Sequence, residues 1–357
     1  MKTDYLTLPT APVKYRPLPP APAPVSESAP VPETPAQVLF PSKINLENVQ
    51  FAIKEAVWKF PKKSLIVLLD QDLVVPGVPC LDCRKLSVKE FETRDFQNSV
   101  FLYACDSDET GAPFIEQIIS RGGTFIPVYD ATPSLYVHDN NIARKVLEAE
   151  YVEQRAAGFA KWDFGPHDFI NLIQAIDVTA RLEGDYLEIG CFRGSSGCAA
   201  LRYMREIGLR RNCYFLDVFE GFEYSQAKSS ADAYWAGTHQ TEGKAEVEKR
   251  LRKYERPESG PRVVVAKSNV IDDALPSTIK GICVANIDVD LYEAVLAAMQ
   301  KVAPLIVKGG IMIVEDPGHT PLLIGARVAL NHFLKTPAAA GFLPLYMQSG
   351  QVFLIRM

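Results

Sequence analysis

The stretch DYLEIGCFRGSSG, residues 185–197, decides which fold this sequence predicts. Its first half, DYLEI, predicts a strand, and a tight turn with Gly190 and Gly194 leads into a helix that Ser195 or Ser196 can cap. Glycine lets the backbone of such a turn approach a ligand closely. A strand-to-helix turn of this kind is typical of the ligand-binding edge of a doubly wound α/β sheet.

The spacing of the glycines narrows the class of ligand. The dinucleotide fingerprint is G-x-G-x-x-G, whereas this chain has Glu188, then Gly190, then Gly194. The carboxylate of Glu188 would repel a diphosphate, which favours a cationic nucleoside such as a sulfonium. A nucleotide-dependent oxidoreductase stays an alternative, because a glycine turn followed about 27 residues later by an acid, Asp217, also fits a dinucleotide site.

The segments around this turn predict the rest of the sheet. Asp217 ends the next strand, CYFLD, where its carboxylate is suited to the two hydroxyls of a ribose. Further strands are expected at RVVVA, CVANID, GGIMIVED, GFLPLY and QVFLIRM, with helices between them. Five parallel strands and a closing C-terminal pair predict a doubly wound sheet whose ligands bind at the carboxyl ends of the strands.

Acidic residues follow two of these strands. Asp290 and Glu293 have the spacing of a helix-capping box, which explains Asp290 as an N-cap, but Asp288 ends the strand itself. Asp288 should face Glu315 and Asp316 at the end of the next strand. Three converging carboxylates without nearby histidines or cysteines suit Mg²⁺. The alternative is that Glu315 and Asp316 only cap the following helix.

Composition excludes several other classes of protein. The chain has 357 residues, 47% of them hydrophobic, and a net charge of -5. Because the net charge is negative, we do not expect the chain to bind nucleic acid or an anionic membrane. No apolar signal or membrane-spanning run is found, and the cytoplasm is the expected location. The seven cysteines suit a reducing compartment, and Cys80 and Cys83 are interpreted as two unrelated loop cysteines rather than a redox pair or half a zinc site.

The motifs GDYLEIGCFRGSS, LDVFEGF, IDVDLYEA, GGIMIVED and GARVALNHF, in this order, resemble those of the TylF-type macrocin O-methyltransferases, which methylate sugar hydroxyls of macrolide antibiotics. The resemblance covers roughly residues 150–357. It implies a class I methyltransferase fold, S-adenosylmethionine as methyl donor, and Mg²⁺.

The resemblance also implies roles for single residues. The Glu188 to Ser196 motif would hold the methionine part, Asp217 the ribose, and Ser268 the adenine edge. The metal ligands would be Asp288, Glu315 and Asp316. Within the methionine motif, the residues implied are Glu188, Gly190, Arg193, Gly194, Ser195 and Ser196.

The chain departs from the family in three ways. The family usually has two aspartates where this chain has Glu315 and Asp316, its members are shorter, and residues 1 to about 140 have no counterpart. The identity of the acceptor therefore does not transfer.

We expect three regions. Residues 1–41 hold eleven of the 26 prolines and should form a disordered tail, residues 42–140 a small α/β domain, and residues 141–357 the methyltransferase domain. The small domain weakly resembles the second half of a Rossmann-type domain of sugar-nucleotide enzymes, but it lacks a glycine-rich phosphate turn and should not bind nucleotide. It is expected to pack on the methyltransferase or on a second subunit of a homo-oligomer, with the helices of residues 143–176 covering its open face.

The predicted reaction is methylation of a hydroxyl on a sugar or another small, natural-product-like metabolite. A dication lowers the pKa of a bound hydroxyl, and Asp288, His239 and His319 are the candidate bases. His239 lies in a long polar segment after Asp217 that is expected to act as a lid over the acceptor. A non-catalytic nucleoside-binding protein of the same fold is the second alternative.

Overall fold

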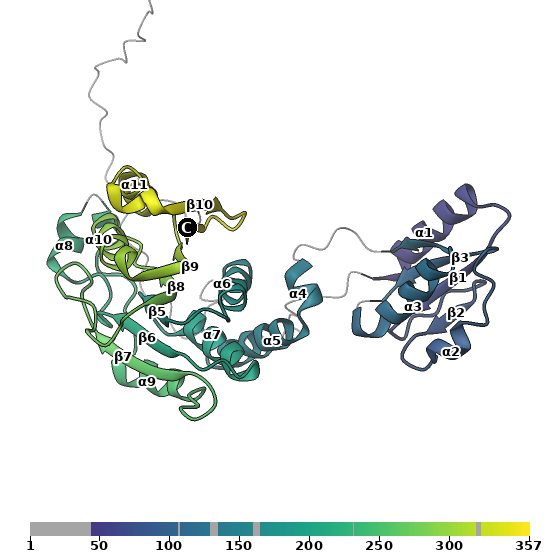
Figure 1. Ribbon diagram of the computed structural model, residues 1–357, viewed down its shortest axis with the longest axis horizontal. Coiled ribbons are helices and arrows are strands. Elements are labelled where there is room, and N and C mark those ends of the chain that lie inside the picture. The colour runs from purple at the N-terminus through teal and green to yellow at the C-terminus, as the bar shows by residue number, and fades with distance from the viewer. Residues whose placement is uncertain (1–43, 106–107, 129–134, 160–164, 231, 319–322) are drawn as a thin grey trace, which may run out of the picture. The chain divides into compact units, whose positions relative to one another are not determined.

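The computed structural model describes residues 44–105, 108–128, 135–159, 165–230, 232–318 and 323–357 (Figure 1). The predicted proline-rich tail, residues 1–41, and the candidate base His319 lie outside the described residues. Among the helices of the described ranges, none is long and apolar enough to cross a lipid bilayer.

Residues 44–128 contain a four-stranded parallel sheet in the order β2-β1-β3-β4. The strands are β1 (Ser64–Leu69), β2 (Cys80–Asp82), β3 (Ser99–Ala104) and β4 (Thr124–Pro127), and the helices are α1 (Leu46–Lys59), α2 (Val88–Phe91) and α3 (Asp108–Ser120). Side chains cap the first two helices: the Asn45 carboxamide accepts the N–H of Asn48, and Ser87 forms a capping box with Glu90.

Each face of this sheet has its own hydrophobic cluster. Val49, Ala52 and Ala56 of α1 pack on one face, and Phe91 of α2 and Phe114 of α3 belong to the cluster on the other. The prediction that the helices of residues 143–176 cover an open face is therefore wrong. The buried residues of those helices belong instead to a cluster of the second sheet.

The second sheet has seven strands in the order β10-β11-β9-β8-β5-β6-β7. Its strands are β5 (Asp185–Ile189), β6 (Asn212–Asp217), β7 (Arg262–Lys267), β8 (Ile282–Ile287), β9 (Ile306–Val314), β10 (Phe342–Tyr346) and β11 (Val352–Arg356). Strands β5 to β9 are parallel, β11 runs antiparallel to β9, and β10 pairs with β11. The order reverses between β5 and β8, which confirms the predicted doubly wound sheet with its antiparallel closing pair.

The helices around the second sheet divide between its two faces. They are α4 (Leu135–Asp139), α5 (Asn141–Ala156), α6 (Pro166–Val178), α7 (Ser195–Glu206), α8 (Ser225–Ser229), α9 (Lys244–Arg252), α10 (Tyr292–Val302) and α11 (Gly325–Phe333), with short 3₁₀ turns at Ala233–Trp235, Ala303–Leu305 and Pro337–Gly341. Helices α4 to α7 and α9 supply the cluster on one face, and α10 and α11 supply the cluster on the other.

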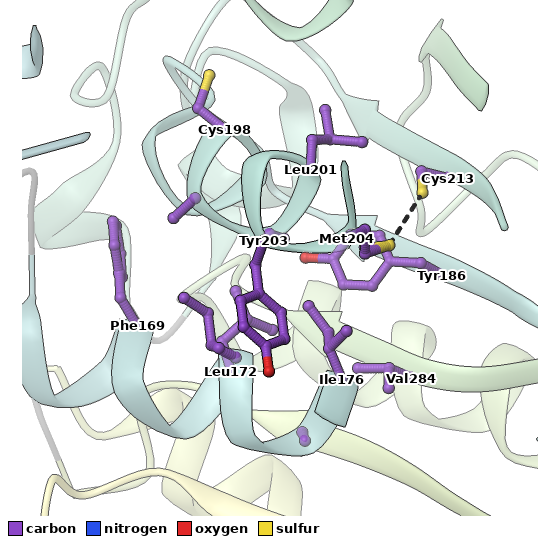
Figure 2. Packing of buried hydrophobic residues seen from close by; sticks show 14 of the residues in the cluster. Phe169, Leu172, Ile176, Tyr186, Cys198, Leu201, Tyr203, Met204, Cys213 and Val284 are labelled. Carbon is purple, nitrogen blue, oxygen red and sulfur yellow. Dashed lines mark hydrogen bonds between the residues drawn. The ribbon is translucent and has the colours of Figure 1, made fainter. Parts of the chain in front are cut away.

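The first of these clusters is built where α6 and α7 meet the sheet (Figure 2). Tyr203 of α7 lies near Leu172 of α6, and Met204 of α7 lies near Tyr186 of β5. Most residues of α7 are buried, and Cys198, Leu201, Tyr203 and Met204 belong to this cluster. The alternation of β5 sends Tyr186 and Glu188 to this face and Leu187 and Ile189 to the other.

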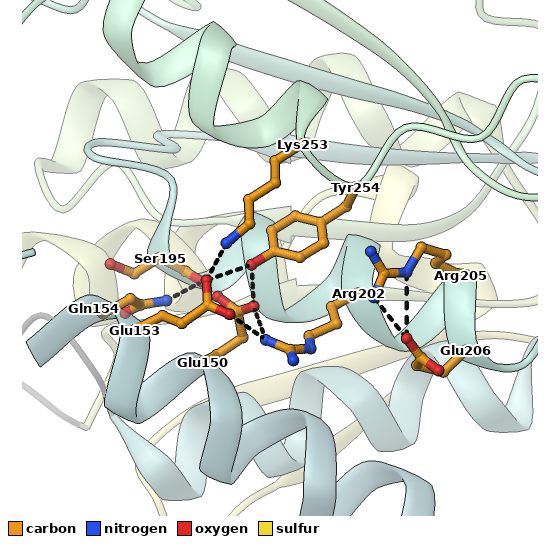
Figure 3. Close-up of polar contacts among 9 residues, drawn as sticks. All are labelled: Glu150, Glu153, Gln154, Ser195, Arg202, Arg205, Glu206, Lys253 and Tyr254. Atoms are coloured by element: carbon orange, nitrogen blue, oxygen red, sulfur yellow. Dashed lines mark hydrogen bonds and ion pairs between the residues drawn. The ribbon is translucent and has the colours of Figure 1, made fainter. Parts of the chain in front are cut away.

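Buried polar contacts attach α5 to this face (Figure 3). The carboxylate of Glu150, which is 1% exposed, accepts hydrogen bonds from Arg202 of α7, at 2.8 Å, and from the hydroxyl of Tyr254. Gln154 donates its Nε2–H to the carbonyl of Ser195 at 3.1 Å. Because the Glu150 carboxylate is buried, losing one of its partners would leave its charge poorly compensated. Helix α5 therefore holds the first turn of α7, directly behind the glycine turn.

Candidate active site

The turn after β5 lies against the end of β8. Gly190 has φ +90°, and a Cβ added to it would lie 1.8 Å from the carbonyl oxygen of Asp288. The N–H of Asp288 in turn donates to the carbonyl of Ile189 at 2.9 Å. Only glycine fits this position, because both its conformation and its space exclude a side chain.

The helix after this turn begins differently from the prediction. Gly194, with φ +83°, is the N-cap of α7, and no side chain caps the helix. Ser195 and Ser196 are its first two residues, so the prediction that one of them is the cap is wrong. The hydroxyl of Ser196 instead donates to the carboxylate of Glu188 at 2.5 Å.

Asp217 connects the turns after β5 and β6. Its Oδ2 accepts the N–H of Phe192 at 2.8 Å, and its Oδ1 accepts the N–H of Phe219 at 2.6 Å. Burial raises the pKa of the Asp217 carboxyl, and the N–H groups of Phe219 and Phe192 oppose that rise by stabilising the charge. Each carboxylate oxygen keeps a second lone pair, so the group can accept further hydrogen bonds.

A pocket opens at the carboxyl ends of β5, β6, β7 and β8, next to the reversal of strand order. Gly190, Asp217 and Ser268, three of the residues predicted to bind the cofactor, line it. The further lining residues are Ile189, Phe192, Leu216, Val218, Gly221, Phe222, Tyr224, His239, Asn269, Val270, Asp288, Val289, Asp290 and Ala294.

Glu188 lies under the pocket and does not line it. Its side chain is fully buried and accepts hydrogen bonds from the hydroxyls of Tyr186, at 2.6 Å, and Ser196. Burial raises the pKa of the Glu188 carboxyl to about 7, against the effect of these two hydrogen bonds. The carboxyl therefore supports the turn from behind rather than presenting a charge to a ligand.

The other residues predicted from the methionine motif also lie outside the pocket wall. The guanidinium of Arg193 stacks over the rings of Phe159, at 5.4 Å, and Phe192, at 5.5 Å, and its Nε lies 3.6 Å from a carboxylate oxygen of Glu242. Ser195 presents its carbonyl to Gln154. Of the motif, Ile189, Gly190 and Phe192 line the pocket.

Three carboxylates meet beside the pocket. Oxygens of Asp288 and Asp290, which follow β8, and of Asp316, which follows β9, lie within 4.8 Å of one another. Burial and the charges of nearby acids, that of Asp316 foremost, raise the pKa values of Asp288 and Asp290 well above their usual range. Hard oxygen donors that repel one another at such short distances fit a divalent cation such as Mg²⁺.

The structure changes the predicted set of carboxylates by one residue. Asp290 is not the N-cap of α10: the cap is Leu291, no side-chain bond is made there, and Asp290 has φ +55° and joins the acidic group. Glu315, predicted as a ligand, is absent from this group, and its Oε2 accepts the Nε2–H of Gln351 at 2.6 Å. Of the pair after β9, only Asp316 belongs to the group with Asp288.

His239, one of the candidate bases, lines the pocket. Its ring centroid lies 4.8 Å from that of Phe222, 5.7 Å from that of Phe192 and 6.0 Å from that of Trp235. The hydroxyl of Thr238 lies 2.7 Å from its Nδ1. Asp288, the second candidate, lines the same pocket.

Sequence reasoning missed Asp290 as a site residue and the aromatic wall of Phe192 and Phe222. The signal for Asp290 was present, since two aspartates two residues apart end the strand of residues 283–288. The capping spacing to Glu293 gave it a structural explanation instead. In the structure the Glu293 carboxylate accepts a hydrogen bond from the hydroxyl of Ser230 at 2.5 Å.

Residues 115–336 match the family described as Macrocin-O-methyltransferase (TylF). The chain belongs to the TylF family. It is an O-methyltransferase, and this activity excludes the alternative that the chain is a nucleotide-dependent oxidoreductase. No curated sequence is similar enough to this TylF-family chain to count as a match.

The solved structures that are similar to this TylF-family chain include three methyltransferases. The O-methyltransferase NovP is 20% identical over 54% of this chain and 81% of its own, with a TM-score of 0.45. The calicheamicin methyltransferase CalS11 is 19% identical over 63% of this chain and 98% of its own, with a TM-score of 0.43. The Podospora anserina methyltransferase PaMTH1, solved with S-adenosylhomocysteine, is 16% identical over 64% of this chain and 99% of its own, with a TM-score of 0.38.

Proposed function

We propose that this O-methyltransferase transfers the methyl group of S-adenosylmethionine, with the help of Mg²⁺, to a hydroxyl of a sugar or another small metabolite. The observation that carries the proposal is the group formed by Asp288, Asp290 and Asp316 beside a pocket at the carboxyl ends of the strands. Membership of a family named for macrocin methylation supports a glycosylated or sugar acceptor.

The pocket suits the methyl donor. Gly190 lets the backbone of the first turn approach it, and Asp217 offers lone pairs for the hydroxyls of a ribose. Ser268 and Asn269, which follow β7, provide polar atoms at the far end, where an adenine edge would lie. Phe192 and Phe222 give the wall apolar surface for the rest of the nucleoside.

The three aspartates would hold the cation next to the acceptor. A bound dication lowers the pKa of a coordinated hydroxyl and so makes it a better nucleophile. The chain itself must then remove the proton of that hydroxyl. His239 and Asp288 line the pocket and are the described groups that we propose for this step, and the Thr238 hydroxyl orients the ring of His239.

Substitution of the aspartates tests the metal assignment. Asp288→Asn and Asp316→Asn should each abolish methyl transfer, measured as S-adenosylhomocysteine formed with a panel of sugar-containing acceptors. Both should bind S-adenosylmethionine within about tenfold of the wild type, since the nucleoside contacts remain. Excess chelator should stop the wild-type reaction, and Mg²⁺ should restore it.

Two matched variants test whether Asp290, rather than the predicted Glu315, is a ligand of the cation. Asp290→Asn removes a carboxylate of the group and should weaken Mg²⁺ binding in calorimetry by about tenfold or more, whereas Glu315→Gln removes a neighbouring buried carboxylate outside it and should change the affinity by less than about threefold. Full activity in chelator would contradict the metal role. Binding of S-adenosylmethionine without any product across the panel would favour the non-catalytic alternative.

A further inference from the structure

The first turn of α10 is capped by a residue from a distant part of the chain. Helix α10 starts two residues after Asp290, and its N-cap Leu291 makes no side-chain bond. The N–H of Tyr292 instead donates to Oδ2 of Asp232 at 3.0 Å, across a separation of 60 residues. Asp232 is 5% exposed, so this contact is made inside the protein.

The surroundings of Asp232 leave it little freedom. A Cβ added to Gly325, the first residue of α11, would lie 1.6 Å from Oδ2 of Asp232 and 2.7 Å from the nitrogen of Tyr292. The N–H of Asp232 donates to the hydroxyl of Ser230 at 3.1 Å, and that hydroxyl donates to Glu293 of α10. Asp232 is therefore held between α10 and α11 with room for its carboxylate and nothing larger.

The turn that Asp232 holds carries a strained residue. Asp290 has φ +55°, a conformation that costs a residue with a Cβ free energy and persists only where the surroundings impose it. Leu291, the next residue, is buried against Phe222 and Ala227 from the segment that leads to Asp232. This conformation brings the carboxylate of Asp290 to Asp288 and Asp316.

We infer that Asp232 is a positioning residue for the cation site. By accepting the N–H of Tyr292 it fixes the turn from Val289 to Leu291, so that Asp290 keeps its left-handed conformation and points toward Asp288 and Asp316. The hydrogen bond supplies this effect, since the negative charge of Asp232 close to three other carboxylates is unfavourable unless a cation is bound. The inference rests on the proposed metal dependence.

The test compares Asp232→Ala with Asp232→Asn in the full-length protein, with Mn²⁺ as the probe and its free concentration followed by electron paramagnetic resonance. Alanine removes the acceptor, so the strained turn relaxes and Mn²⁺ affinity should fall by about tenfold or more. Asparagine keeps an oxygen acceptor without the charge and should stay within about threefold of the wild type.

Two further variants guard against a general loss of structure. Gly325→Ala displaces the Asp232 carboxylate and should reproduce the loss of Mn²⁺ affinity while Asp232 itself is intact. Asp272→Ala is the control for loss of an aspartate, because the Asp272 carboxylate also accepts side-chain hydrogen bonds, but from Gln226 of α8 and Asn269 rather than from α10. It should bind Mn²⁺ like the wild type, and all four variants should bind S-adenosylmethionine within about threefold of it.

The outcomes separate this inference from the proposed function. If the wild type binds no Mn²⁺, the metal role is wrong and this inference is wrong with it. If the wild type binds Mn²⁺ and Asp232→Ala binds it equally well, the inference alone is overturned. An equal loss in Asp232→Asn and Asp232→Ala also overturns it, because charge rather than the hydrogen bond would then be responsible.

Discussion

Glu188 should make the stability of the protein depend on pH. Its carboxyl is fully buried and its pKa is raised to about 7, against 4.5 for the unperturbed group. The folded protein therefore binds this proton more tightly than the unfolded chain does. The protonated Glu188 carboxyl therefore stabilises the fold fully below pH 4.5. This contribution to stability decreases as the pH rises through 7, and it is absent at higher pH.

The size of the effect follows from the shift. One pKa unit corresponds to about 1.4 kcal/mol, so the shift in the pKa of Glu188 contributes about 3 kcal/mol to the free energy of unfolding at low pH. Most of this contribution is lost between pH 5 and pH 8. Glu188→Gln cannot ionise and should lack this loss. The free energy of unfolding of the wild type minus that of Glu188→Gln should fall by roughly 2 to 3 kcal/mol over this range.

Urea unfolding followed by circular dichroism, in chelator at each pH, measures this difference. Taking the difference removes contributions that the other acids make to both proteins. Glu183→Gln, at an exposed position just before β5, is the control and should follow the wild-type curve. Tyr186→Phe should move the window to higher pH, because the Tyr186 hydroxyl lowers the pKa of Glu188. A difference that is constant from pH 5 to pH 8 would refute the reasoning.

Three further predictions concern the pocket and the acidic group. Asp217→Ala should weaken S-adenosylmethionine by about 2 kcal/mol in calorimetry, because hydrogen bonds to a charged acceptor are lost. Gly190→Ala should cost about 3 kcal/mol or more in thermal or urea unfolding, since its Cβ meets a backbone oxygen, whereas Gly208→Ala, also at positive φ but in open space, should cost about 1 kcal/mol. Mg²⁺ affinity should rise with pH in calorimetry above the usual aspartate pKa of 3.8, because the raised pKa values of Asp288 and Asp290 make protons compete with the cation.

Much of the second sheet could be predicted from local sequence. Apolar strands of five to nine residues alternate with amphipathic helices, and this order predicts parallel strands with crossovers. Gly190, Asp217, Asp288 and Asp316 were also predictable as neighbours, because carboxyl ends of parallel strands share one edge. That rule depends only on where strands end, which the sequence states directly.

The direction of each side chain at that edge was not predictable. Glu188 and Glu315 follow the alternation of their strands and point to the face covered by α6 and α7, where Ser196 and Gln351 bind them. The sequence shows that an acid ends a strand, but not which face of the sheet will be filled by a helix and which will open to a pocket.

Asp290 shows the remaining limit most clearly. Its spacing to Glu293 is that of a capping box, and in an isolated helix that pairing would be favourable. In the folded protein Asp232 caps the helix by accepting the N–H of Tyr292, and the Glu293 carboxylate accepts a hydrogen bond from Ser230. Asp290 therefore does not form the capping box and joins the acidic group. The sequence alone determined the sheet, the glycine turn and the edge where the acids gather. Only the tertiary structure decided which acids face one another, because competing partners come from segments that the chain brings together on folding.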